Sequence, residues 1–251
     1  MLVPPRPAAE NMARDSALME RARRTGESVF SVYQWERPAL SLGRNQNARG
    51  RYDFAALQRR GMDVVRRPTG GRALVHDREI TYSVTARLDD NASLRECYTR
   101  INRVLIHALA SIGVVAAEAE GDAPPQPRND SPCFASPARG EILVNGRKLV
   151  GSAQWRSSDA LLQHGSILIE DDQHLIRRVA LSESTVTYPA PATLASLLTP
   201  VPSVAEVAAA LFSAVRALED PTASALDEVE IRPAALDRIT EFENELWTWR
   251  R

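Results

Sequence analysis

The chain has 251 residues, of which 44% are apolar and 25% charged, and its formal net charge is −1. This length allows one large hydrophobic core, and no apolar run approaches the roughly 20 residues that cross a bilayer. The N-terminal segment holds prolines and charges where a secretory signal would be apolar. We therefore expect a cytoplasmic protein with no membrane or nucleic-acid partner. A single catalytic domain is expected over 1–251, with a core at about 25–180 and a helical extension at about 190–251.

In chain order, the first predicted element is a helix over 11–24, where apolar residues recur at helical spacing. The clearest helix is predicted over 93–112, with Ser93 as N-cap, Glu96 completing a capping box and Gly113 after its end. The other predicted elements are strands over 29–35 and 39–42, a helix over 52–60, strands between 62 and 86, strands over 141–144, 148–156 and 160–169, and helices over 203–218 and 233–249. Strands interleaved with a few helices indicate an α+β fold with antiparallel-rich mixed β-sheets packed with helices.

Arginines are concentrated in one part of the first third of the chain. A local basic surface that faces an acidic partner explains this concentration, and an ordinary solvated charged face explains it equally well. The arginines concerned are Arg44, Arg49, Arg51, Arg59, Arg60, Arg66, Arg67, Arg72 and Arg78.

Only two cysteines occur, which is too few for a structural zinc cluster and weak evidence for a disulfide. Cys133 lies in a stretch over 121–140 that is rich in Pro, Gly, Ser and Asp, and loops of this length are usually functional or disordered. A thiol there gains little from burial, so it is a candidate nucleophile. Cys97 falls inside the predicted helix over 93–112 and is expected to be a packing residue.

Lys148 is the only lysine, although the chain has 31 basic residues in all. It opens a predicted strand directly after an Asn145-Gly146 turn, and such a hairpin can fold it back toward the Cys133 loop. An ammonium group near the thiol would lower the pKa of Cys133 and supply thiolate. Spacing alone leaves open whether the two residues meet.

Three polar, glycine-containing runs are candidates for the wall of a ligand pocket. RRPTGGRALVHD places arginines before a double glycine and a histidine after it, although the glycines also fit a simple turn and the histidine a structural role. GSAQWR and LQHGSI put small and polar residues on consecutive strands, where a solvent-facing side is the alternative. The predicted pocket residues are Arg67, Gly70, Gly71, Arg72, His76, Gly151, Ser152, Gln154, His164 and Gly165.

These runs resemble the signatures of the catalytic domain shared by lipoate-protein ligases, octanoyltransferases and biotin-protein ligases. RRPTGGRALVHD is similar to that family's RRxxGGGxVxHD signature, which lines the lipoyl or octanoyl pocket. LVNGRKLVGSAQWR with LLQHGSILIE resembles its second signature, whose lysine is the central catalytic residue. The resemblance spans about 37–171, with a weaker continuation through TLASLL. The signature's third glycine is Arg72 here, and the SPCF loop holds Cys133; both features are similar to LipM-type octanoyltransferases.

The resemblance implies the biotin/lipoate-protein ligase catalytic-domain fold and a catalytic pair of Cys133 and Lys148. It implies octanoyl-acyl carrier protein as donor and the lipoyl domain of the glycine cleavage H protein as acceptor. No ATP, metal or other cofactor is expected, because a thioester donor is already activated. A monomer is expected.

Three rival functions stay open. An ATP-dependent lipoate-protein ligase would need no nucleophilic cysteine, and Arg72 and Cys133 argue against it. An amidotransferase of the same family would move octanoyl or lipoyl groups between the H protein and other lipoyl domains through the same cysteine. A catalytically silent module that only binds such partners would not need both Cys133 and Lys148.

Overall fold

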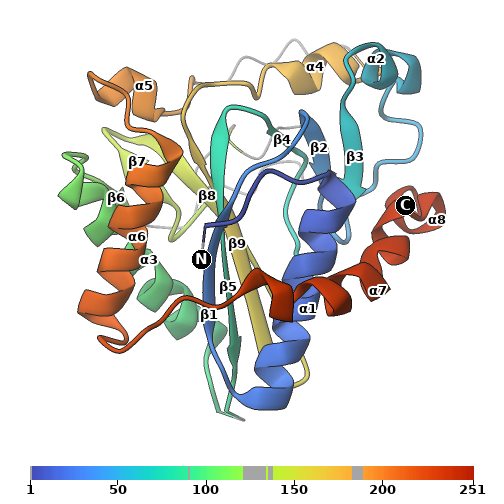
Figure 1. Ribbon diagram of the computed structural model, residues 1–251. Helices are drawn as coiled ribbons and strands as arrows, with labels where there is room; N and C mark the ends of the chain where they lie inside the picture. Colours follow the sequence, from blue (N-terminus) through green and yellow to red (C-terminus); the bar gives the residue numbers. More distant parts are fainter. Residues whose placement is uncertain (1, 90, 121–133, 135–137, 183–188) are drawn as a thin grey trace.

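The structure is a computed structural model that describes residues 2–89, 91–120, 134, 138–182 and 189–251. At its centre lies a six-stranded sheet in the order β1-β5-β9-β8-β7-β6, in which every neighbouring pair is antiparallel (Figure 1). In that order the strands are β1 (Val29–Tyr33), β5 (Glu79–Arg87), β9 (Ala160–Leu168), β8 (Arg147–Ser157), β7 (Ile142–Val144) and β6 (Ala117–Glu118).

A second, three-stranded sheet has the order β3-β2-β4, with β3 (Asp63–Arg66) parallel and β4 (Leu74–His76) antiparallel to β2 (Ala39–Leu42). Successive side chains of a strand point to opposite faces. Leu40 and Leu42 therefore pack on one side, in an apolar cluster with α2 (Phe54–Arg59) and α4 (Leu175–Val179). Ser41 points to the other side, toward the large sheet.

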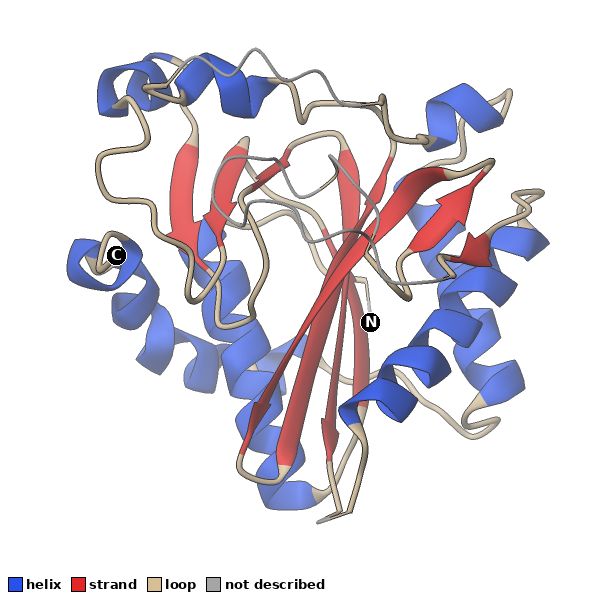
Figure 2. Ribbon diagram, turned by 180° about the vertical axis from the view of Figure 1, so that it is seen from behind, coloured by secondary structure: helices blue, strands red, loops and turns tan. Residues whose placement is uncertain are grey.

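Helices cover both faces of the large sheet (Figure 2). On one face, α3 (Leu94–Ser111) and α6 (Val204–Leu218) close the largest apolar core. On the other face lies α1 (Ala8–Thr25), which is backed by α7 (Arg232–Glu243). The shorter helical elements are α5 (Leu194–Leu197), η1 (Glu228–Glu230) and α8 (Glu245–Thr248). In the described part of the chain, no helix combines the length and apolar character of a membrane span.

The fold class predicted from the sequence is confirmed, and the cap at Ser93 is present, since its side chain accepts a hydrogen bond from the Glu96 backbone. Four predicted elements were wrong in their bounds by two residues or more. The helix over 11–24 begins at Ala8, and the helix over 52–60 begins at Phe54. The strand over 29–35 ends at Tyr33. The helix over 233–249 is broken at Asn244, because the Asn244 side chain accepts a hydrogen bond from the Leu246 backbone and caps α8 as a separate helix. The division into a core and a helical extension stays a prediction.

Candidate active site

A cavity of about 360 Å³ lies between the large sheet, the small sheet and α1. Its lining comes from β1, β2, β4, β5, β8, β9 and the turns beside them. The structure places around this one cavity all ten residues that the sequence predicted for a pocket: Arg67, Gly70, Gly71, Arg72, His76, Gly151, Ser152, Gln154, His164 and Gly165.

The cavity has an open end and a closed end. Gly71 and Ala138 are exposed and form part of its opening, whereas Tyr33, Thr81 and Ser166 are fully buried. The run in β9 therefore does not form a solvent-facing strand side, because β9 is buried along its whole length. The run in β8 is half-buried from Ser152 onward.

Two glycines allow the backbone packing that shapes the wall. A β-carbon at Gly43 would lie 2.0 Å from the carbonyl oxygen of Gly71, and one at Gly165 would lie 2.5 Å from that of Gly151. No side chain fits at such separations, so only glycine permits these contacts.

Arg66 and Arg67 are buried and hold the loops at the cavity opening. The Arg67 guanidinium donates to the carbonyl oxygens of Ser41, Gly70 and Arg72 at 2.8–3.0 Å. Arg66 donates to the carbonyl oxygens of Gly43 at 2.6 Å, Gln46 at 2.8 Å and Thr248 at 2.9 Å. Burial lowers the pKa of Arg66 to about 10, which leaves it a cation near neutral pH. The prediction that these two arginines belong to a basic surface was wrong.

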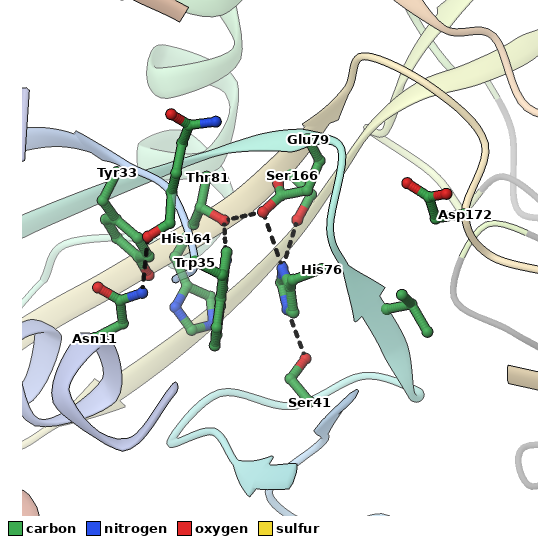
Figure 3. Close-up of polar contacts among 12 residues, drawn as sticks. Asn11, Tyr33, Trp35, Ser41, His76, Glu79, Thr81, His164, Ser166 and Asp172 are labelled. Carbon is green, nitrogen blue, oxygen red and sulfur yellow. Dashed lines mark hydrogen bonds and ion pairs between the residues drawn. The ribbon is translucent and has the colours of Figure 1, made fainter. Parts of the chain in front are cut away.

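His76 lies at the inner part of the cavity and has partners on both ring nitrogens (Figure 3). Its Nδ1 lies 3.1 Å from Glu79 Oε1, its Nε2 lies 2.8 Å from Ser41 Oγ, and its ring stacks on Trp35 with centroids 4.0 Å apart. Burial lowers the pKa of His76 below its ordinary value. A neutral imidazole fits these contacts, with Nδ1–H donating to the carboxylate and Nε2 accepting from the Ser41 hydroxyl.

His164 joins α1 to the loop before β4. Its Nδ1 lies 2.9 Å from Asp15 Oδ2 and its Nε2 lies 2.6 Å from Thr69 Oγ1. Tyr33 donates its hydroxyl to the same Asp15 oxygen at 2.9 Å. Burial, followed by the nearby Asp15 carboxylate, raises the pKa of Tyr33 well above its ordinary value, so it stays a neutral donor. Asp15 and Thr69 were not predicted from the sequence.

Ser152 and Gln154 belong to a chain of hydrogen bonds centred on Tyr82. The Ser152 and Tyr82 hydroxyls lie 2.6 Å apart, Gln163 donates to the Tyr82 hydroxyl at 2.8 Å, and Gln154 donates to Gln163 at 2.8 Å. Burial raises the pKa of Tyr82 to about 12. These bonds join β5, β8 and β9 on the side of the large sheet that faces α3 and α6.

Lys148 is 2% exposed and its ammonium lies beside Gly151, since a β-carbon there would be 2.8 Å from Lys148 Cε. Its Nζ donates to Glu141 Oε1 at 2.5 Å and lies 4.6 Å from the centre of the Phe134 ring. Cys133 lies outside the described residues, but Phe134 follows it directly in the sequence. Phe134 is buried. Lys148 thus lies beside Gly151 and Glu141, which both line the cavity, and next to the neighbour of the predicted nucleophile.

Glu141 is a cavity residue that the sequence analysis missed. Its second carboxylate oxygen accepts from the Ala138 backbone at 2.7 Å. The hairpin gave only part of the signal: the Asn145-Gly146 turn pairs Leu143 with Lys148, which brings Glu141 near Lys148. The pairing register shifts between Ile142 and Leu143, so alternation alone would not have placed the two side chains together.

Cys97 is a half-buried free cysteine in α3, and burial raises the pKa of its thiol, which makes it a poor nucleophile. Among the described residues, no group of three His, Cys, Asp or Glu side chains could hold a metal ion.

Comparisons with known proteins agree with this geometry. Residues 7–231 match the model of the lipoyl protein ligase A/B catalytic domain. A protein of Carboxydothermus hydrogenoformans named octanoyltransferase LipM is 41% identical over 177 residues, which are 68% of this chain and 64% of that protein. The Bacillus subtilis protein of the same name is 37% identical over 175 residues, which are 66% of this chain and 63% of that protein's length. The match thus spans slightly under two thirds of these relatives' length.

Solved structures give the same fold. Lipoate-protein ligase A bound with ATP superposes with a TM-score of 0.79 at 20% identity, covering 99% of this chain and 97% of that one. The bi-partite lipoate protein ligase of Thermoplasma acidophilum gives a TM-score of 0.78 at 18% identity, with 99% and 94% covered. At such identities the likeness concerns the fold alone. Because the family model covers most of its length, this chain belongs to the lipoyl protein ligase A/B catalytic domain family.

Proposed function

We propose that the protein is an octanoyltransferase that acts through a thioester on Cys133. Octanoyl-acyl carrier protein would be the donor, and a lysine of a lipoyl domain, as in the glycine cleavage H protein, the acceptor. The observation that carries this proposal is the buried Lys148 ammonium, which lies behind the cavity residues Gly151 and Glu141 and contacts the residue that follows Cys133. The name of the LipM relatives supports the choice of reaction.

In the first step, the Cys133 thiolate attacks the carbonyl carbon of the donor thioester. The new carbon–sulfur bond forms, the bond to the carrier breaks, and the carrier thiolate leaves and takes up a proton. Lys148 stabilises the oxyanion of the tetrahedral intermediate, and the hydrogen bond from Lys148 Nζ to Glu141 holds the ammonium in place. No ATP is consumed, because the thioester is already activated.

In the second step, the neutral amine of the acceptor lysine attacks the octanoyl-S-enzyme. An amide forms, the bond to Cys133 breaks, and the amine proton passes to the departing sulfur. The octanoyl-S-enzyme that forms in the first half-reaction is consumed in the second, after the carrier has left, so ping-pong kinetics are expected. The ten cavity residues predicted from the sequence would hold the acyl chain and its carbonyl, together with the apolar side chains of Met12, Trp35 and Leu74.

The test is intact-protein mass spectrometry after mixing the purified protein with octanoyl-acyl carrier protein without ATP. Wild type should gain one octanoyl group that is discharged when H protein is added, and Cys133→Ala should gain none. Cys97→Ala is the matched control and should behave as wild type. Lys148→Met should slow acylation by about 10²–10³-fold, the loss typical of removing one oxyanion donor.

Two results would favour the rival enzymes. If no adduct forms without ATP, but free lipoate with ATP modifies the acceptor, the protein is a ligase and Cys133 is not the nucleophile. If octanoylated H protein loads Cys133 faster than octanoyl-acyl carrier protein does, the protein is an amidotransferase. The monomeric state and the cytoplasmic location stay predictions.

We also propose that an arginine-rich face helps to bind the acidic donor. Figure 1 shows α2 and α4 side by side, and they are joined by hydrogen bonds from the Asp53 backbone to Val179 at 2.8 Å and from the Leu181 backbone to Arg51 at 2.9 Å. Asp53 is the only acidic residue within 48–60 and 174–182. The exposed arginines of these segments are Arg49, Arg59, Arg60, Arg177 and Arg178.

The double variant Arg59→Glu with Arg60→Glu should lower the acylation rate several-fold at low salt and flatten its dependence on salt. Arg24→Glu with Arg95→Glu, an equal charge change at exposed sites on α1 and α3, should leave that dependence unaltered. Equal salt dependence in both double variants would show that the arginine-rich face is only a solvated surface.

A further inference from the structure

The cavity crosses the strands of the large sheet along one row of paired residues. Gly151 of β8 pairs with Ser166 of β9, Ser166 with Thr81 of β5, and Thr81 with Tyr33 of β1. All four residues line the cavity. Neighbouring strands are about 4.8 Å apart, so this row is about 14 Å long.

The row has a reactive end and a blocked end. The Lys148 ammonium lies over Gly151 at one end. The next two residues, Ser166 and Thr81, are small. The Trp35 ring already reaches the Thr81 hydroxyl, so the floor stays open for at most two strand spacings, about 10 Å. At the third spacing the large ring of Tyr33 rises from the floor, with Trp35 and Met12 beside it, and all three are buried.

Two of the three blocking side chains are fixed by hydrogen bonds. Tyr33 donates to Asp15, and Trp35 Nε1 donates to Thr81 Oγ1 at 2.9 Å while its ring stacks on His76. Met12 comes from α1, carries no hydrogen-bonding group and has an unbranched side chain that adapts its shape readily. The end wall thus combines two rigid rings with one adjustable side chain.

We propose that Tyr33, Trp35 and Met12 set the length of the acyl chain that the enzyme accepts. A straight, saturated chain of about eight carbons, with its carbonyl at Lys148, reaches this wall, and a longer chain is rejected by it. The inference rests on the proposed function for the position of the carbonyl. It assigns the specificity to the β1 end of the row and makes Ser166 the midpoint of the acyl path.

The test measures binding rather than transfer. S-acyl N-acetylcysteamine thioesters with four to twelve carbons are titrated by calorimetry into Cys133→Ala protein, which forms no covalent adduct. Affinity should rise about fourfold per methylene, the ~0.8 kcal/mol of a buried CH₂ converted at 1.4 kcal/mol per tenfold. The rise should stop near eight carbons in the parent protein.

Three further substitutions in the Cys133→Ala protein locate the wall. Met12→Ala should move the preferred length to ten carbons or more, and Ser166→Val, which narrows the path at its midpoint, should move it to six or fewer. Met19→Ala is the matched control: Met19 is a second buried methionine of α1, packed against Ala160 and Leu162 outside the cavity. It should leave the preferred length unchanged.

The inference is overturned if affinity in the parent protein keeps rising to twelve carbons, or if the preferred length is the same in the Met12→Ala and Ser166→Val proteins. Should Met12→Ala not fold, Ser166→Val decides alone, because it leaves the packing of α1 intact. Chain-length selection with no acylation of wild-type Cys133 would refute the transferase proposal and keep the binding wall. If wild-type Cys133 is acylated but the preferred length does not shift in the variants, the transferase proposal stands and the proposed wall is refuted.

Discussion

The two faces of the large sheet are built from alternate residues of the same strands, yet they differ in chemistry. The face toward α3 and α6 is mostly apolar and includes Val32, Ile80 and Ile167, with Tyr82 and Gln163 as buried polar exceptions. The face toward α1 carries hydroxyls and a histidine that are just as deeply buried: Ser31, Thr81, Ser83, Thr85, His164 and Ser166. The first face supplies the apolar burial that stabilises the fold, and the second supplies the cavity.

The difference shows that the polar α1 face lowers the stability of the fold. Buried polar groups are tolerated when they are hydrogen-bonded, as His76 and His164 are. Among the described residues, Ser83 Oγ and Thr85 Oγ1 are buried with no hydrogen-bond partner. An unsatisfied buried group of this kind costs about 1–3 kcal/mol, so the α1 face lowers the stability that the α3–α6 face provides.

The largest expected effect is on the apolar face. Leu105 of α3 is fully buried in the core, so Leu105→Ala should lower the free energy of unfolding by about 2–5 kcal/mol. It should not change the preferred acyl length, because Leu105 does not line the cavity. Urea unfolding and the thioester titration check both points. A changed length preference would mean that the two faces are not independent.

On the cavity face, His76 should make stability depend on pH. Because the pKa of folded His76 is lowered, the unfolded chain binds a proton near its ordinary pKa of about 6.5 while the folded protein does not. Stability is therefore lost as pH falls through about 6.5, by up to about 1.4 kcal/mol per pH unit.

Urea unfolding at pH 7.5, 6.5 and 5.5 measures this slope. His76→Gln should flatten it, and His174→Gln, at an exposed histidine, should leave it unchanged. An equal slope in wild type and His76→Gln would show that burial of this imidazole is not linked to stability.

The smallest expected effect is a gain. Thr85→Val keeps the side-chain shape and removes the unpartnered hydroxyl, so it should raise the free energy of unfolding by about 1 kcal/mol. Thermal unfolding checks this against Ser157→Ala, at a partly exposed site near the end of β8. A loss of stability in Thr85→Val would mean that the hydroxyl holds a buried water molecule.

Local patterns predicted most of the sheet and half of the residues that line the cavity. Alternation and turn residues identified β5, β8 and β9. Polar interruptions in β8 and β9 marked five of the predicted cavity residues, and the RRPTGGRALVHD run before β5 marked the other five. These residues could be recognised in the sequence because glycine and polar residues are unusual on buried strands.

Contacts between distant segments could not be predicted in this way. Asp15 reaches His164 across 149 positions, and nothing in the α1 sequence distinguishes Asp15 from a solvent-facing carboxylate. Arg67 was predicted to line the pocket, but the burial of Arg66 and Arg67 by hydrogen bonds to the backbone was not predicted, because it depends on carbonyl groups that the fold brings together. The short helices α4 and α5 were missed because they contain little more than one turn each.

Arg66 also has a consequence for the order in which the protein matures. Its guanidinium bonds to the loop at Gly43 and Gln46 and, through Nε, to the carbonyl of Thr248. Residues emerge from the ribosome in sequence order, so this last bond cannot form until position 248 has been synthesised. The loop at Gly43, whose backbone packs against Gly71 at the cavity opening, is therefore fully braced only after α7 and α8 have been synthesised.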